Sequence, residues 1–438
     1  MSDVLEYLEK EPAKFISFLK EKGIKKFYFV TDEKTGSLIS SHEELKPIAE
    51  YINADKRDYI KHEGMFFEVS SKYDSLYGAF VHKTNRGQAA GGLRYWKYFT
   101  FEDFLRDGLR LSAGMTRKNS LAGLWWGGGK GIILHNPEVD FYDKEIRKYL
   151  YQDYGRFVTT LQGCYITAED VGSNTEDMAN VHLTTRFVTC IPPEVGGSGN
   201  PSEPTARGVI AGMEAALNFL GTDFNDKTIV VQGMGNVGAP VIKYAFEKGA
   251  KKVIAGDINQ NTIDKVVNSL QGKNLETRLT QIGDNSILTE DCDVVAPCAT
   301  GAILKPEIIE NLKAKIVCGA ANNQLEDSDR DDVLLQKRNI IYVPDFLTNR
   351  MGIVNCANEQ YGYVNNDPLF EQHLNKEWEY SVYQTTLRVL NASKETGVAP
   401  AKKAIELADE LAEVNHPIFG HRGQLIINTL VENKWHLV

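Results

Sequence analysis

The chain has 438 residues, 42% hydrophobic and 25% charged, a composition typical of a globular protein with two or three domains. A net charge of −10 without a Lys/Arg run argues against nucleic acid or an anionic membrane as a partner. We find neither a signal-peptide pattern nor an apolar run near the ~20 residues that span a bilayer, so we expect a cytoplasmic protein.

The first 60 residues are predicted to be mostly helical. Apolar side chains between Leu5 and Leu19 keep a helical period, and residues 42–52 form a second candidate helix. Apolar segments on both sides of the turn-like residues 32–36 predict a small hairpin between these helices. Further along, strands are predicted at 65–70, 76–82 and 164–168, and helices at 101–118 and 143–161.

Two lysines stand in a glycine-rich stretch, residues 91–131. Lys118 ends the predicted helix 101–118, and Lys130 follows three consecutive glycines. Glycine costs conformational entropy on folding, and it lets backbone or ligand approach closely. Three in a row therefore indicate a structured site and not a chance loop. Desolvation there would lower a lysine pKa towards the range of a base. The alternative is a flexible surface loop with solvated lysines.

Composition changes at residues 196–204, where a segment rich in Gly, Ser and Pro is typical of a hinge or a ligand-contacting loop. After it, strand and helix patterns alternate, which predicts a doubly wound parallel sheet. The region beyond about residue 370 is predicted to be helical again. The alternating elements are helices 206–219, 236–249 and 260–270 and strands 228–232, 252–257, 293–296, 315–318 and 340–343.

A glycine motif follows the predicted strand 228–232 directly. Gly233 would make the tight turn, Gly235 would admit a pyrophosphate to the backbone, and Gly238 would let helix and strand pack closely. Asn236 and Val237 complete the motif at a helix N-terminus, where N–H groups favour phosphate. The motif predicts a dinucleotide site; the alternative is a glycine-rich turn without a nucleotide.

Asp257 ends the second strand of this unit, about twenty residues beyond the glycines. A carboxylate at this point accepts hydrogen bonds from ribose hydroxyls and repels a 2′-phosphate. The residues that follow, Ile258 to Gln260, provide no arginine. The cofactor is therefore predicted to be NAD rather than NADP.

The six cysteines are scattered without a C-x-x-C pair, which favours small reduced core residues over a disulfide framework or a zinc site. No metal is expected. The cysteines are Cys164, Cys190, Cys292, Cys298, Cys318 and Cys356.

Seven motifs fall in one order along the chain. They are Gly91-Gly92-Leu-Arg94, Met115-Thr-Arg-Lys118-Asn, Gly127-Gly-Gly-Lys130, Thr167-Ala-Glu-Asp170-Val-Gly, Gly199-Asn-Pro-Ser202, Gly233–Gly238 and residues 344–359, PDFLTNRMGIVNCANE. Over roughly residues 75–365 this order resembles the glutamate/leucine/phenylalanine/valine dehydrogenase family, with a pattern most like its leucine dehydrogenases.

The resemblance implies an α/β fold with two domains. Residues 1–205, joined by 345–438, would form an α/β substrate-binding and oligomerisation domain, and residues 206–344 a Rossmann domain that binds NAD. The C-terminal helices would return to the first domain. The expected reaction is the reversible oxidative deamination of an L-amino acid to a 2-oxo acid and ammonia, carried out by a homo-oligomer.

Individual roles follow from the same resemblance. Lys118 matches the lysine that holds the substrate α-carboxylate. Lys130 matches the catalytic lysine that must be neutral to activate water, and Asp170 matches the acid that moves protons to and from the amine. Gly91 and Gly92 match residues beside the substrate. Thr205 and Asn323 match residues near the nicotinamide.

The substrate side chain is predicted to be apolar. Ala90 stands where glutamate-specific members of the family carry a lysine, and the other pocket positions are Ala168, Ile353 and Cys356. A glutamate carboxylate among them would be desolvated without a partner, which favours leucine, valine or isoleucine. Phenylalanine or tryptophan is the runner-up, because pocket volume separates such substrates by only ~1–3 kcal/mol. Glutamate as substrate, or a silent NAD- or amino-acid-binding regulator, are further alternatives.

Three features depart from the family pattern. Trp125 and Trp126 precede the glycines, where they would either narrow the cleft or pack the core, and core packing is the favoured interpretation for both. Residues 1–60 form a longer N-terminal region, and Arg350-Met351 replaces a smaller pair before Gly352. Arg86 or Arg350 would have to reach the pocket if glutamate were the substrate.

Overall fold

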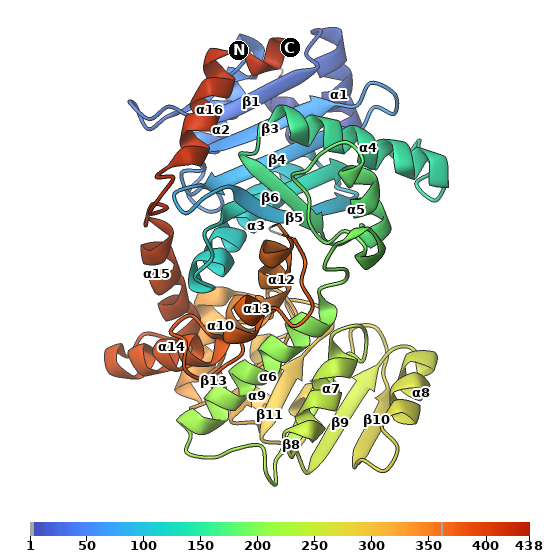
Figure 1. The fold of residues 1–438 in the computed structure, drawn as a ribbon, viewed down its shortest axis with the longest axis vertical. Helices are drawn as coiled ribbons and strands as arrows, with labels where there is room; N and C mark the ends of the chain where they lie inside the picture. The colour runs from blue at the N-terminus through green and yellow to red at the C-terminus, as the bar shows by residue number, and fades with distance from the viewer. Residues whose placement is uncertain (1–3, 361) are drawn as a thin grey trace.

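The computed structural model describes residues 4–360 and 362–438 and contains two sheets, each with its own helices (Figure 1). A mixed seven-stranded sheet occupies the upper half of Figure 1, and a parallel six-stranded sheet occupies the lower half. Within the described residues, no helix combines the length and apolar character needed to cross a membrane. The α/β class with two domains is confirmed; the boundaries at 205 and 344 stay predictions.

The first sheet changes direction in its middle. From β2 to β6 neighbouring strands run antiparallel, whereas β6, β5 and β7 run parallel to one another. The predicted hairpin is β1 and β2, in which Val30 pairs with Ile39. In spatial order the strands are β2 (Leu38–Ser40), β1 (Lys26–Thr31), β3 (Gly64–Val69), β4 (Leu76–Lys83), β6 (Gly127–Leu134), β5 (Ala89–Trp96) and β7 (Tyr165–Glu169).

Helices cover both faces of this sheet. One face carries a core rich in phenylalanine under α1 (Pro12–Glu21), α2 (Lys46–Ala54) and α3 (Phe101–Leu121). The other face carries a second core under α4 (Lys144–Thr160) and α5 (Thr175–His182).

The extent predicted for the first helix was wrong. Residues Leu5–Tyr7 form a short 3₁₀ helix, and α1 starts only at Pro12. Proline disfavours helical backbone at the residue before it, and Glu11 is extended with ψ of 137°. The second helix likewise starts at Lys46 instead of residue 42, after a 3₁₀ turn.

Strands β5 and β6 were not expected, because glycine is a poor strand former. A flexible loop with solvated lysines is wrong: the glycine run is a buried central strand. A Cβ on Gly128 would overlap Thr116 on α3, and one on Gly91 would overlap the carbonyl of Gly129. Here glycine allows a helix and two strands to pack more closely than side chains permit.

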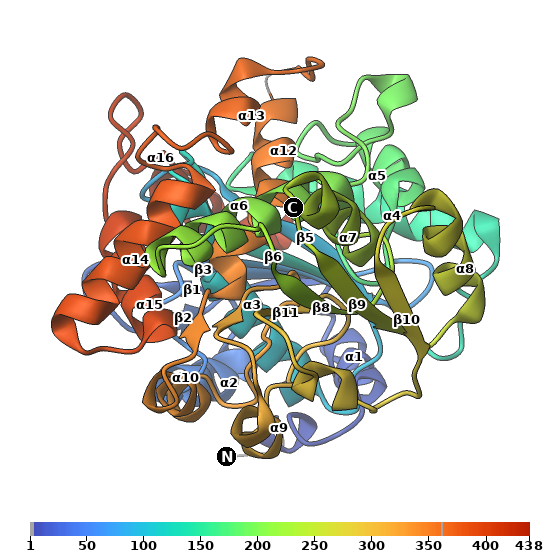
Figure 2. The ribbon, with the colours of Figure 1, turned by 90° about the horizontal axis from the view of Figure 1, so that it is seen from below.

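The second sheet confirms the predicted parallel, doubly wound arrangement, seen from below in Figure 2. Its order, β10-β9-β8-β11-β12-β13, places the first strand of the unit in the middle. Strand β10 was not predicted. The elements are β8 (Thr228–Gln232), α7 (Gly238–Glu247), β9 (Lys252–Asp257), α8 (Gln260–Ser269), β10 (Leu275–Leu279), β11 (Val294–Pro297), α9 (Pro306–Asn311), β12 (Ile316–Val317), α10 (Ser328–Lys337) and β13 (Ile341–Tyr342).

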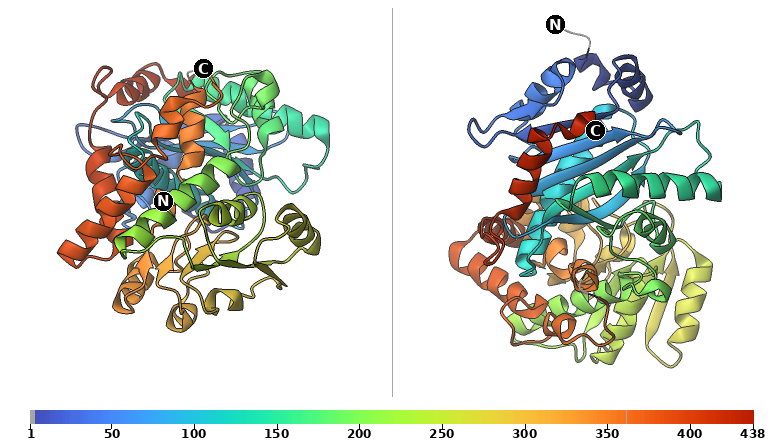
Figure 3. Two further views of the ribbon diagram at one scale, coloured as in Figure 1. Left: turned by 60° about the horizontal axis from the view of Figure 1, so that its bottom comes forward. Right: turned by 45° about the horizontal axis from the view of Figure 1, so that its top comes forward.

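The chain after β13 returns to the first sheet, as predicted for the C-terminal helices (Figures 1 and 3). Helix α14 packs on α6, α15 packs on α3, and α16 contributes to the core beneath the first sheet. Lys26 on β1 donates to the carbonyl of Val438 at 2.8 Å. The elements are α6 (Ser202–Phe219), α11 (Asp345–Thr348), α12 (Met351–Glu359), α13 (Pro368–Gln372), α14 (Val382–Thr396), α15 (Pro400–Ala412) and α16 (Arg422–Glu432).

Candidate active site

A buried charge cluster forms where β5, β6 and β7 lie side by side. Lys130 on β6 is only 4% exposed, and its Nζ is in close contact with Oδ2 of Asp170, just beyond β7. Arg94 on β5 donates to the same oxygen from Nε at 3.2 Å. Two cations from neighbouring strands therefore share one carboxylate.

The cluster perturbs the pKa of each member. Burial lowers the pKa of Lys130, Asp170 opposes that shift and Arg94 adds to it. Burial would raise the pKa of Asp170, but Lys130 and Arg94 outweigh it and bring the value to about 2. At neutral pH Asp170 is therefore ionised, beside a lysine that has lost part of its hydration.

Lys118 belongs to the same electrostatic unit. It lies on α3 and is partly buried. Burial lowers its pKa, Asp345 and Asp170 act against the shift, and Lys130 reinforces it. The structure thus brings Lys118, Lys130 and Asp170 within electrostatic reach of one another.

Three charged residues of this region received no role from the sequence. Arg94 was noticed only as part of a motif, and it also pairs with Asp107 on α3 at 2.7 Å. Asp345 stands in the PDFLTNR motif, and its carboxylate accepts from the backbone N–H of Asn323 at 2.9 Å. Burial raises the pKa of Glu169 to about 7, and its Oε2 atom is buried without a hydrogen-bond partner. A charged residue inside one of the seven motifs was the available signal for all three.

The four predicted pocket residues come together from three elements. Ala90 on β5, Ala168 on β7, and Ile353 and Cys356 on α12 are all buried in one hydrophobic cluster. At Gly92, a Cβ would lie 2.6 Å from Cβ of Asp170, so the strand passes too close to the acid for a side chain.

The two arginines that could have served a glutamate side chain are engaged elsewhere. Arg86 donates to the carbonyls of Leu124 and Leu411. Arg350 donates to the carbonyl of Leu121 at 2.7 Å and to the hydroxyl of Thr385 at 3.2 Å. These bonds hold both guanidinium groups against backbone at the ends of helices.

The tandem tryptophans differ from each other. Trp126 is buried, as predicted, and donates to Gln360 at 2.8 Å. The core prediction is wrong for Trp125, which is 41% exposed. The guanidinium of Arg86 lies 4.3 Å from the centre of its ring, a cation–π contact that stabilises an aromatic side chain at the surface.

The predicted dinucleotide loop has the geometry that a pyrophosphate needs. Gly233 adopts a positive φ of 91°, and Gly238 starts α7 so close to it that a Cβ would overlap the Gly233 carbonyl. A Cβ on Gly235 would meet nothing within 4 Å. The backbone through Asn236 and Val237 is thus open on one side, which fits the approach of a phosphate group.

Asp257 lies at the end of β9, where its carboxylate accepts from the backbone N–H of Met234 at 2.8 Å and of Asn259 at 2.9 Å. It therefore stands beside the glycine loop. Thr205 in the first turns of α6 donates to the carbonyl of Pro201 at 2.8 Å. Asn323 follows β12 and has a left-handed φ of 52°.

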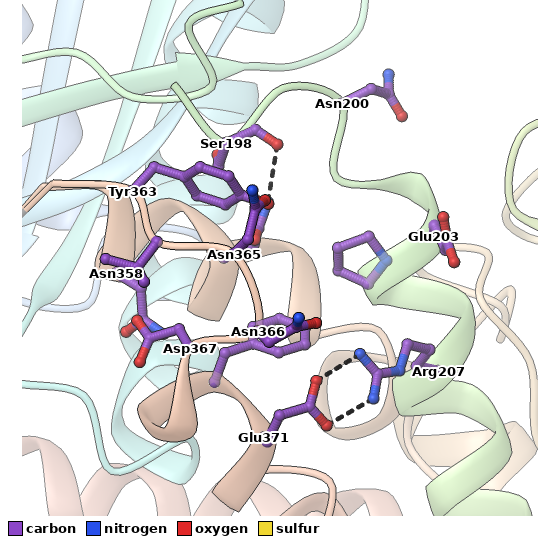
Figure 4. A pocket seen from close by; sticks show the side chains of 14 residues that line it. Ser198, Asn200, Glu203, Arg207, Asn358, Tyr363, Asn365, Asn366, Asp367 and Glu371 are labelled. Carbon is purple, nitrogen blue, oxygen red and sulfur yellow. Dashed lines mark hydrogen bonds and ion pairs between the residues drawn. The ribbon is translucent and has the colours of Figure 1, made fainter. Parts of the chain in front are cut away.

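A polar hollow of about 270 Å³ lies beside α6 and α12 (Figure 4). Its walls come from α6, α12, α13 and the segment before α13, and Arg207 pairs with Glu371 there through bonds of 2.8 and 2.7 Å. Asn355 and Asn358 line it from the helix that also carries Ile353 and Cys356. None of the predicted site residues lines this hollow, so it is separate from the charge cluster.

Comparison with known proteins covers most of the chain. The profile of the Glutamate/Leucine/Phenylalanine/Valine dehydrogenase family matches residues 196–413. The profile of the Glu/Leu/Phe/Val dehydrogenase dimerisation domain matches residues 73–187.

Individual relatives agree with these profiles. Leucine dehydrogenase of Bacillus subtilis (strain 168) is 39% identical over 76% of this chain and 86% of its own length. Valine dehydrogenase of Streptomyces albus is 36% identical over 75% of this chain and 86% of its own length. The crystal structure of L-tryptophan dehydrogenase from Nostoc punctiforme has a TM-score of 0.66 and 31% identity, covering 80% of this chain and 96% of that one. The chain therefore belongs to the glutamate/leucine/phenylalanine/valine dehydrogenase family, whose members are amino-acid oxidoreductases.

Proposed function

We propose that the protein catalyses the reversible, NAD-dependent oxidative deamination of leucine, valine or isoleucine to the 2-oxo acid and ammonia. The observation that carries the proposal is the buried cluster of Lys130, Asp170 and Arg94, on the strands that also carry the buried Ala90 and Ala168 of the proposed side-chain pocket. A charged centre for the amino-acid backbone and an apolar pocket for its side chain match an aliphatic substrate.

In this proposal each site residue either binds the substrate or moves a proton. The ammonium of Lys118 binds the α-carboxylate, and Gly91 and Gly92 let the substrate lie against β5. Asp170 takes a proton from the amine. NAD, held by the glycine loop, would supply the acceptor for the hydride that leaves Cα. Lys130, made less basic by burial, removes a proton from the water that attacks the resulting imine. Asp170 then returns a proton to the departing ammonia.

The choice of NAD rests on the glycine loop and Asp257. The open face at Gly235 accepts a pyrophosphate, and the carboxylate of Asp257 lies beside that loop, where it would repel a 2′-phosphate. Thr205 and Asn323 are proposed to contact the nicotinamide.

The apolar pocket favours aliphatic side chains over glutamate, since Arg86 and Arg350 both bind backbone carbonyls elsewhere. An aromatic substrate is the second candidate, because a relative 31% identical in sequence is a tryptophan dehydrogenase. A silent regulator would not need the complete set of Lys118, Lys130 and Asp170. We also propose a homo-oligomer, in line with the dimerisation-domain profile, and a cytoplasmic location.

The test is a scan of NADH formation, followed by its absorbance, with each of the twenty L-amino acids. We expect leucine, valine or isoleucine to react fastest, and NADP to be a poor substitute for NAD. Faster turnover of glutamate than of leucine would contradict the pocket assignment. A lack of turnover with every amino acid would instead favour the regulator.

A further inference from the structure

Two cysteines that are far apart in the sequence touch beneath the predicted substrate pocket. The Sγ atoms of Cys190 and Cys356 lie 2.8 Å apart, although 166 positions separate them. Their residues are only 1% and 3% exposed, and both are free thiols. This sulfur–sulfur distance is well inside the usual separation of non-bonded sulfur atoms and only about 0.8 Å longer than a disulfide bond.

The backbone around the pair holds the two sulfurs in place. Glu359 lies one turn after Cys356 on α12, and its carboxylate accepts from the backbone N–H of Cys190 at 2.9 Å and of Ile191 at 3.3 Å. It also accepts from the N–H of Ser198 at 2.9 Å. Cys190 has a left-handed φ of 62°, a costly conformation for a residue other than glycine. The surrounding bonds thus hold Cys190 in a strained position that faces Cys356.

We propose that Cys190 and Cys356 are a redox-active dithiol, which two-electron oxidants of the hydroperoxide class convert into a disulfide. One thiolate attacks the peroxide oxygen, forming a sulfenic acid and releasing hydroxide. The second thiol loses its proton and attacks that sulfur, forming the S–S bond and releasing water. In total, two thiols and one hydrogen peroxide give one disulfide and two water molecules.

The geometry assigns different parts to the two sulfurs. The hydrogen bond to Cys356 and burial raise the pKa of the Cys190 thiol well above its ordinary value, so this sulfur keeps its proton. Cys356 lies on α12 with Ile353 and belongs to the predicted side-chain pocket, which is the route proposed for a small oxidant. Cys356 therefore reacts first and Cys190 resolves the sulfenic acid. A protonated partner also makes the reaction slow at neutral pH and faster in alkali.

Oxidation would change the pocket as well as the redox state. The new bond would tie α12 covalently to the segment after α5 and draw the Cys356 sulfur towards Cys190. This consequence rests on the proposed function, because it assigns Cys356 to the pocket for the substrate side chain. We expect a several-fold fall in kcat/KM for leucine that dithiothreitol reverses, and slower oxidation when leucine is bound.

The test measures disulfide formation directly, without needing turnover. The full-length protein is treated with hydrogen peroxide in steps, alkylated, and weighed by mass spectrometry. We expect a loss of about 2 Da, with two of the six thiols protected from alkylation. Trypsin releases residues 187–207 and 351–376 as peptides with one cysteine each, and these should appear cross-linked until the sample is reduced.

Matched variants control the assignment. Cys190→Ser and Cys356→Ser should each abolish the cross-link, whereas Cys292→Ser, in the core of the other sheet, should keep it. The proposal is overturned if another cysteine is oxidised first, if the disulfide joins two chains, or if the cross-linked peptide pair is missing once other thiols have reacted. Because these masses are measured on the wild-type sequence, a variant that misfolds leaves this result intact. Absence of leucine turnover with the cross-link present would reject the proposed function alone.

Discussion

The two sheets of this molecule use glycine for opposite purposes. In the loop after β8, Gly235 leaves space outside the protein, because a Cβ there would meet nothing within 4 Å. In β5 and β6, glycines permit close packing inside the protein. A Cβ on Gly91 would overlap the neighbouring strand, and a Cβ on Gly128 would overlap α3. The first arrangement is the proposed place for the cofactor's pyrophosphate. The second lets helix α3, with Lys118, approach the strand that carries Lys130.

The substitution Lys130→Ala tests most directly whether β6 and the loop after β8 have separate functions. If β6 carries the chemistry and the loop after β8 carries the cofactor, kcat should fall at least ~1,000-fold, because a general base is lost. The NAD dissociation constant, measured by fluorescence titration, should stay within about twofold of wild type. Near-normal kcat would remove Lys130 from the proposed mechanism, and a large loss of NAD affinity would mean that the two regions are not independent.

The pair Gly128→Ala and Gly235→Ala tests the contrast between the glycines. Gly128→Ala should lower the free energy of unfolding by about 3 kcal/mol or more, because the new methyl group overlaps Thr116. Gly235→Ala should change it by less than about 0.5 kcal/mol while weakening NAD binding. Urea denaturation and NAD titration of both variants provide the readout. An equal loss of unfolding free energy in Gly128→Ala and Gly235→Ala would contradict the proposed difference between the two kinds of glycine.

Ala90→Lys probes the apolar pocket at the edge of the tightly packed strands. A buried ammonium without a partner should reduce kcat/KM for leucine about 100-fold and improve glutamate relative to leucine. Ala90→Leu serves as the control for size without charge. In wild type, leucine should exceed glutamate in kcat/KM; the reverse order would show that another cation reaches the side chain.

A pair of neutral histidines makes the packing of the first sheet sensitive to acid. His62 bonds to the carbonyl of Leu109 at 2.9 Å and His82 to Thr116 at 2.8 Å, both on α3. Burial lowers the pKa of His62 to about 4 and that of His82 well below its usual value. The folded state favours the neutral rings, so their contribution is complete above about pH 6.5 and is lost as pH falls towards 4.

For His62 this contribution amounts to about 2 kcal/mol between pH 7.5 and pH 5. Between pH 7.5 and pH 5, the urea midpoint should therefore fall more for wild type than for His62→Gln, whose side chain cannot be protonated. An equal fall in both proteins would indicate that the ring is not kept neutral by folding.

Asp257→Ser is expected to have the smallest effect. Removing one partly exposed carboxylate should raise the ratio of NADP to NAD efficiency by roughly fivefold, about 1 kcal/mol. Steady-state kinetics with both cofactors measure the ratio, and thermal unfolding checks the loop, because Asp257 also supports Met234 and Asn259. A wild-type preference for NADP would contradict the role assigned to this strand end.

The same difference between the sheets explains what could be predicted from sequence. The β8–α7–β9 unit follows from local patterns, because strand, glycine turn and helix are adjacent in the chain. Strand β6 could not be recognised, since its glycines are explained by distant residues that pack against them, such as Thr116 at Gly128 and Tyr165 at Gly129. Lys130 and Asp170 were found as motif residues, but the sharing of one carboxylate by Lys130 and Arg94 depends on strand register. The contact of Cys190 with Cys356 has no local signal in the sequence, because 166 positions separate the two residues.

Asp345 acts on one residue of each proposed binding site. Its carboxylate holds the backbone of Asn323, and its charge acts on Lys118. If Lys118 binds the substrate carboxylate as proposed, that carboxylate would share the ammonium's charge with Asp345 and so change the hydrogen bond of Asp345 to Asn323. Coupling free energy is reciprocal. If binding of the amino acid changes the affinity for the cofactor by some factor, binding of the cofactor must change the affinity for the amino acid by the same factor. Under the proposed roles, one buried carboxylate would make the occupancies of the substrate and cofactor sites depend on each other.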